Sequence, residues 1–174
     1  MYLKRIFAII GLTVMLFAST PIAVAQQTSG SGLSISPTRS ELTINPGKAD
    51  IIQITLKNIS GVDIKAVAVV NNFDSNNETG EPKIITDPSV QSPNSIKNFL
   101  IGVGDIIIKK DETKKISIPV QIPSDTVSGA YYGIIRYTAE PVSKEEATQK
   151  QVALNASLGL IVLIQVPGNI TEQV

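Results

Sequence analysis

The 174-residue chain carries 15 basic and 15 acidic side chains, contains neither cysteine nor histidine, and is only 5% aromatic. The balanced charge and the scarcity of aromatic rings exclude a basic or base-stacking surface for nucleic acid. The missing residue types exclude disulfides, the usual zinc sites, and Ser-His or Cys-His nucleophile pairs. Composition therefore predicts a protein that is not an enzyme, with no cofactor and no small-molecule substrate.

The first 25 residues have the pattern of a signal peptide. Lys4 and Arg5 precede an apolar run from Ile6 to Ala18, and Ala23-Val24-Ala25 fits a small-residue cleavage site. A membrane anchor is the alternative, but the run is shorter than the roughly 20 residues that span a bilayer. We therefore predict export to the periplasm, the cell surface or the medium, with a mature chain the size of one domain.

Residues 26–32 are rich in Gly and Ser and are predicted to be a flexible leader, so residues 33–174 form the folded domain. Apolar side chains alternate on both sides of Pro37, at Leu33, Ile35, Leu42 and Ile44. This pattern predicts an edge strand that is interrupted once, because proline cannot donate a ladder hydrogen bond. Asn45-Pro46-Gly47 then predicts a turn.

The rest of the domain alternates between apolar strands and polar turns. Strands are predicted at 52–57, 64–70, 116–122, 131–137 and 158–166, with shorter candidates at 83–86, 99–103 and 106–108. The strand at 64–70 is apolar on both faces and is expected to be central. Two polar stretches, 71–93 and 141–150, are predicted to be exposed connections, and the second could hold one helical turn.

Seven to nine strands without an amphipathic helix predict an all-β protein. The fold we expect is an immunoglobulin-like antiparallel β-sandwich, because short alternating strands with Pro/Gly/Asn turns are typical of two packed sheets. A closed barrel is the alternative, since the number of strands does not distinguish it.

Four segments carry a resemblance to known proteins: Leu33 to Arg39, Asn45-Pro46-Gly47, Ile52 to Asn58, and Pro123 to Gly133. From Leu33 to Val166 the chain resembles bacterial exported immunoglobulin-like domains of the pilus-chaperone kind. It also resembles the peptidoglycan-binding domain of WxL-interacting surface proteins. The resemblance implies a β-sandwich of the cell envelope.

The pilus-chaperone family uses a first-strand arginine within a Thr-Arg pair to hold the C-terminal carboxylate of its client, and Thr38-Arg39 stands at the matching place. A guanidinium presents a planar fork that suits a carboxylate. The family's basic residue on a late strand has no counterpart in the segment from Leu158 to Val166. The resemblance therefore makes Thr38 and Arg39 candidate partner-binding residues.

An acidic stretch supplies oxygen ligands at Asp74, Asn76, Glu78 and Glu81, as a calcium loop would. It departs from the EF-hand pattern, because Ile85 stands where the bidentate glutamate is needed. A calcium site and a solvated loop both remain open, and no metal site is firm. Carboxylate pairs in this loop are expected to lie in solvent, without an apolar pocket or a stacking floor for a sugar ring, which disfavours glycosidase chemistry.

Tyr131 and Tyr132 are predicted to be structural, because sandwich domains commonly bond a tyrosine hydroxyl to nearby backbone. The function predicted from these observations is a non-catalytic cell-envelope module that engages a protein partner or a cell-wall component through sheet edges and loops. An extended partner segment is expected to add to the edge strand near Arg39. The alternatives are a pilus-chaperone-like assembly factor and a calcium-dependent adhesion module.

Overall fold

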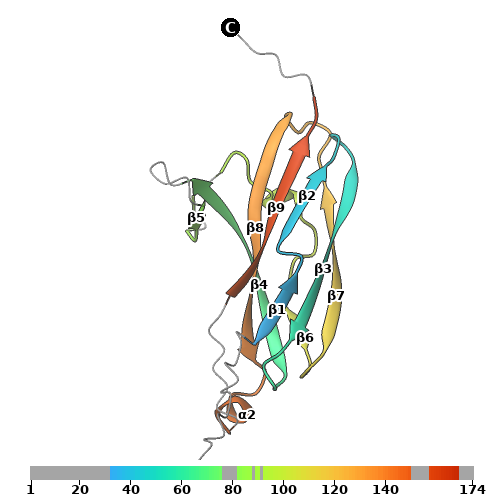
Figure 1. The fold of residues 1–174 in the computed structure, drawn as a ribbon. Helices are drawn as coiled ribbons and strands as arrows, with labels where there is room; N and C mark the ends of the chain where they lie inside the picture. Colours follow the sequence, from blue (N-terminus) through green and yellow to red (C-terminus); the bar gives the residue numbers. More distant parts are fainter. Residues whose placement is uncertain (1–31, 76–81, 88, 91, 150–156, 169–174) are drawn as a thin grey trace, which may run out of the picture.

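The computed structural model describes residues 32–75, 82–87, 89–90, 92–149 and 157–168. These residues form a β-sandwich of two facing layers (Figure 1). Nine strands lie within the described ranges: β1 (Leu33–Ser36), β2 (Arg39–Thr43), β3 (Ala49–Asn58), β4 (Ile64–Ser75), β5 (Pro82–Ile85), β6 (Ile106–Ile108), β7 (Thr113–Gln121), β8 (Gly129–Pro141) and β9 (Ser157–Val166). The predicted all-β sandwich is thus confirmed.

The smaller sheet has the order β1-β3-β7, and the larger has the order β2-β9-β8-β4-β5, with β6 also pairing with β4. All pairs are antiparallel except β2 with β9, which are parallel. The sandwich is thus antiparallel, as predicted, apart from this one parallel pair. Strand β4 lies inside the larger sheet, as its two apolar faces indicate.

The first predicted strand divides between the two sheets. Strand β1 pairs with β3 in the smaller sheet, the Ser36-Pro37 peptide is cis, and β2 then pairs with β9 in the larger sheet. Figure 1 shows β1 and β2 in blue, one after the other along the same side of the molecule. Alternation in the sequence predicted the strands and the break, but not the change of sheet.

The core lies between the two layers. As the predicted alternation requires, every second side chain along a strand points into it. Ile52, Ile54 and Leu56 of β3 are buried, as are Ile135 and Tyr137 of β8. Burying a side chain of this size stabilises a fold by about 1.5–3 kcal/mol. The fold is therefore held by ordinary apolar packing, which a chain without cysteine needs.

Asn58, the last residue of β3, is a fully buried polar residue. Its Nδ2 lies 2.7 Å from Val62 O, 2.9 Å from Lys109 O and 3.1 Å from Ile108 O. Its Oδ1 accepts hydrogen bonds from the backbone N–H and the hydroxyl of Ser60. Because both ends of the amide are satisfied, Asn58 joins the turn after β3 to the turn before β7 without an unpaired polar group.

Two local predictions differ from the structure. Strand β4 runs to Ser75, so the first part of the stretch predicted as a loop is strand. Residues 97–99 form a short 3-10 helix in place of the strand expected at 99–103. The connection after β8 does hold a helical turn, α2 (Lys144–Gln149). No helix among the described residues is both long and apolar enough to cross a membrane.

Candidate partner-binding edge

Strand β2 is one end strand of the larger sheet and carries the predicted site. Thr38 lies just before it and Arg39 begins it. Side chains at Arg39, Glu41 and Thr43 are exposed, whereas those at Ser40 and Leu42 are partly buried. Because side chains alternate across a strand, the first three share the solvent face of the sheet.

The backbone of β2 pairs on one side only. Thr38 O accepts a hydrogen bond from Ile161 N at 2.9 Å, and Ile44 N donates to Gln165 O at 3.0 Å. In a parallel ladder the groups that bond to one neighbour belong to alternate residues, so the even-numbered residues of β2 face β9. The N–H and C=O groups of Arg39, Glu41 and Thr43 face away from β9, and no other described strand pairs with them.

Arg39 and Glu41 form an ion pair on this edge, with Nε of Arg39 bonded to Oε1 of Glu41. Their side chains are 61% and 63% exposed. An exposed pair of this kind contributes only about 0–1 kcal/mol to stability. Arg39 is therefore not required for the fold, and its charge remains accessible to a partner.

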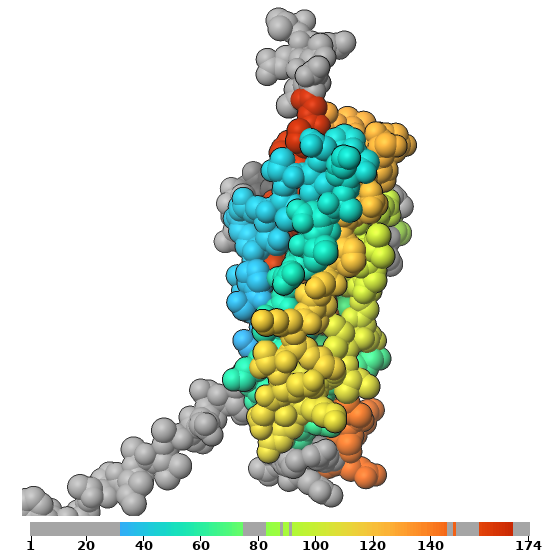
Figure 2. All heavy atoms as spheres, turned by 90° about the vertical axis from the view of Figure 1, so that its right-hand side faces the viewer, coloured from blue at the N-terminus to red at the C-terminus, as the bar shows by residue number. Residues whose placement is uncertain are grey.

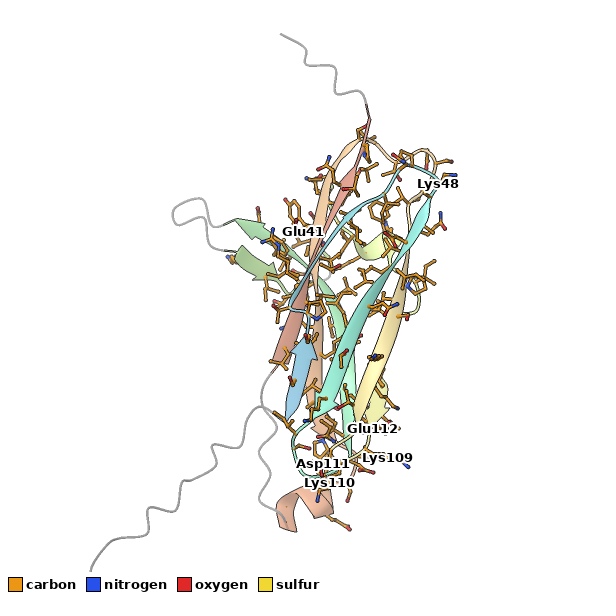
Figure 3. The ribbon with its side chains drawn as sticks, turned by 45° about the vertical axis from the view of Figure 1, so that its right-hand side comes forward. Glu41, Lys48, Lys109, Lys110, Asp111 and Glu112 are labelled. Carbon is orange, nitrogen blue, oxygen red and sulfur yellow. The ribbon has the colours of Figure 1, made fainter. Side chains whose placement is uncertain are left out.

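A shallow groove of about 260 Å³ lies beside this edge. Its lining comes from β2, β8 and β9: Glu41, Leu42, Thr43, Ala130, Tyr131, Leu163, Ile164 and Gln165. Its volume is below the range of about 300–1,000 Å³ that is usual for small-molecule pockets. Figure 3 shows Glu41 on β2, well away from the labelled charged turn of Lys109 to Glu112.

The smaller sheet ends in β1 on one side and in β7 on the other, and β7 is covered differently from β2. Pro119 lies on the side of its ladder that faces away from β3, because Ile101 N donates to Pro119 O at 3.0 Å. Proline there removes no bond to β3 and leaves no N–H donor at that position of the outer edge. Lys114 and Lys115 add positive charge, which opposes pairing with another strand. Figure 2 looks onto this sheet, with β3 in cyan to green beside β7 in yellow.

The far edge of the larger sheet is also occupied. Strand β4 pairs with β6 at one end and with β5 at the other, and between them Ala68 N donates to Asp105 Oδ1 at 3.0 Å. Lys65 Nζ lies 2.8 Å from Asp105 Oδ2. The hydrogen bond from Lys65, followed by that from Ala68 N, holds the pKa of the Asp105 carboxyl below its ordinary value, and the same contact raises the pKa of Lys65.

The predicted calcium loop is only partly described. Asp74 lies near the end of β4, opposite Lys83 of β5, while Asn76, Glu78 and Glu81 lie outside the described residues. Within the described ranges, no three acidic side chains gather as a metal site would require. The calcium prediction therefore stays a prediction.

The tyrosine prediction is confirmed at Tyr131, whose hydroxyl donates to Val127 O at 2.8 Å. Sequence reasoning missed the role of Tyr132, whose ring lies 5.0 Å from that of Phe73. The two rings line a cleft of about 240 Å³ together with Asp74, so the acidic stretch does have aromatic neighbours in space. Phe73 directly precedes Asp74 in the sequence, whereas Tyr132 is far from both, and the pairing of β4 with β8 brings the two rings together.

Comparison with known proteins supports the fold and not a family. No protein-family model and no curated protein sequence matches the chain. Among solved structures, it is similar to a PapD-like domain of human CEP192, with a TM-score of 0.52 and 13% identity over 88% of this chain and 97% of that one. It is also similar to the class 5 fimbriae chaperone CfaA, with a TM-score of 0.51 and 13% identity over 80% of this chain and 59% of that one.

A third similar structure belongs to a chaperone–tip adhesin complex of CFA/I fimbriae biogenesis, with a TM-score of 0.50 and 12% identity. The match covers 80% of this chain and 58% of that one, so the chain spans little more than half the length of these two fimbrial structures. At such identities the likeness concerns the fold alone. The predicted resemblance to immunoglobulin-like domains of the pilus-chaperone kind is thus confirmed as a resemblance in fold.

Proposed function

We propose that this chain is an exported, non-catalytic binding module of the cell envelope that engages a protein partner by strand addition at β2. The observation that supports it is the row of outward backbone groups at Arg39, Glu41 and Thr43, which no described strand pairs. An extended segment can complete such a row with main-chain hydrogen bonds. Export rests on the predicted signal peptide, which lies outside the described residues.

The choice of β2 over β7 and β4 rests on the contrast between these edges. At β7 a proline occupies an outward position, and at β4 an aspartate occupies the N–H of Ala68. Strand β2 contains neither proline nor lysine. A protein segment supplies the alternating donors and acceptors that this row needs, whereas a glycan does not; a protein partner is therefore favoured over cell-wall material.

The proposal is tested with a photo-crosslinking amino acid at position 43, introduced in the source organism. We expect adducts with a protein from position 43 and none from a matched probe at position 115 of β7. Adding Glu41→Pro, which removes one outward N–H and keeps the ladder to β9, should abolish the adduct. Adducts that persist in this variant, or a protein that sediments with wall material and forms no protein adduct, would refute edge binding.

An assembly factor is the second candidate function. Supporting it are the fold shared with fimbrial chaperones and the position of Arg39 at the start of the exposed edge strand. This function predicts that Arg39→Ala abolishes client capture while the midpoint of unfolding hardly moves, because the exposed Arg39–Glu41 pair contributes little to stability. Equal capture by the variant would reject the assembly role and leave the wider binding proposal intact.

A further inference from the structure

We infer that the strand that pairs with β2 belongs to a second copy of this chain, in an antiparallel dimer whose two-fold axis passes through Ser40. This inference rests on the proposed function, because it uses the same free edge. The backbone direction of β2 and the order of charges along it support this arrangement.

The backbone restricts which residues can face each other. In an antiparallel pair, residues whose N–H and C=O groups point at the neighbouring strand form the hydrogen-bonded positions, with Cα atoms about 5.5 Å apart. On β2 these are Arg39, Glu41 and Thr43. A symmetric pair must therefore place members of this set opposite one another, and Pro37 cannot extend it because it has no N–H.

Charge then selects one register. A pair centred on Glu41 sets two carboxylates opposite each other, and one centred on Arg39 sets two guanidinium groups opposite each other, both of which are unfavourable. A pair centred on Leu42 sets Glu41 opposite Thr43 and forms no ion pair. Only the pair centred on Ser40 sets each Arg39 opposite Glu41 of the other copy, twice in one interface.

The side chains on the other face also permit this register. Ser40 meets its own copy on the axis, where the small, partly buried side chain leaves room, and Thr38 lies opposite Leu42. Both charges are accessible, since the Arg39–Glu41 pair is more than half exposed. The intrachain pair thus becomes a four-charge cluster across the axis.

The interface is short, so we expect weak association. Sedimentation equilibrium of the purified exported protein from about 1 µM to 1 mM, the range of weak complexes, should show a monomer–dimer equilibrium. Arg39→Glu and Glu41→Arg should each weaken dimerisation by roughly tenfold or more, because each places like charges in opposition. An equimolar mixture of the two variants should dimerise again, and so should the double variant.

Lys115→Glu, an exposed charge reversal on β7, is the matched control and should leave the association unchanged. The register is tested separately with single cysteines, since the chain has none of its own. Ser40→Cys should form an interchain disulfide on the axis, because non-hydrogen-bonded pairs bring Cα atoms to about 4.5 Å, within disulfide range. Thr43→Cys should not.

A monomer throughout the concentration range overturns the inference, as does a dimer that both charge reversals leave intact. Equal cross-linking by the cysteine at 43 overturns the register. If the chain is monomeric and the probe at position 43 captures a different protein, the inference fails while the proposed function stands. If the probe captures nothing and the chain is monomeric, both fail.

Discussion

Two end strands of this sandwich, β2 and β7, differ in how well their outer edges could pair with another strand. On β7 the proline sits at an outward position, Ile101 N caps its carbonyl, and two lysines lie nearby. On β2 all three outward positions keep their N–H groups, and the charges alternate between Arg39 and Glu41. The difference indicates that β7 resists strand pairing, whereas β2 is suited to it.

Asn58 fixes the turn that leads into β7 and so helps to position the covered edge. Asn58→Ala should lower the free energy of unfolding by about 3 kcal/mol, because several backbone groups that it satisfies are left unpaired in a buried place. Urea unfolding measures this loss. Ile59→Ala, at the exposed neighbouring residue, is the control and should change the free energy of unfolding by well under 1 kcal/mol. Equal losses in the two variants would show that the hydrogen bonds of Asn58 are not the cause.

A pair of prolines on β2 tests the direction of its backbone groups. Ser40→Pro removes an N–H that faces β9 and should cost about 1–3 kcal/mol. Glu41→Pro removes an N–H that faces solvent and should cost less than about 1 kcal/mol, as Pro119 is tolerated on β7. Urea midpoints of the two variants provide the measurement. Equal losses, or the reverse order, would contradict the assigned edge.

The smallest effect concerns the covered edge at Asp105. Its pKa is lowered in the folded chain, so its contribution to stability is present above the unfolded pKa and is lost as the pH falls through the lower folded value. We expect a small acid-side loss of stability, below about pH 4, that Asp105→Asn removes. Melting temperatures between pH 2 and 7 would show it, and an unchanged acid limb in the variant would assign the loss to other groups.

The contribution of Lys65 to stability changes at alkaline pH. Its pKa is raised in the folded chain, so its share of stability is present below the unfolded value of 10.5 and is lost as the pH rises through the higher folded value. Both groups are exposed, and salt should therefore weaken the two effects together.

Much of the fold could be predicted, because alternation reports burial directly. The strands around Ile52 to Leu56 and Ile116 to Ile122 were expected from period-two patterns, and both lie in the smaller sheet. The predicted turn at Asn45 to Gly47 is also present, with Gly47 at a φ of 74° that favours glycine. The strand predicted at residues 99–103 was wrong, because a short apolar run does not distinguish a strand from a 3-10 turn.

The candidate site was predicted only in part. Thr38 and Arg39 were found through a resemblance, and the structure places them where the edge begins. The ion pair with Glu41 needs only the two-residue spacing of a strand, but which backbone groups face outward depends on the pairing with β9. No local pattern contains that information, because β2 and β9 are more than a hundred residues apart.

By itself, the sequence indicated which face of each regularly alternating strand is buried, because hydrophobic alternation is a local property of a strand. It also excluded disulfides and thiol or imidazole chemistry through the absence of cysteine and histidine. Only the tertiary structure decided which edges remain open, because strand order and register are set by contacts between distant segments. Whether a strand end is covered is a property of its neighbours, so the free edge of β2 became visible only once the two sheets were assembled.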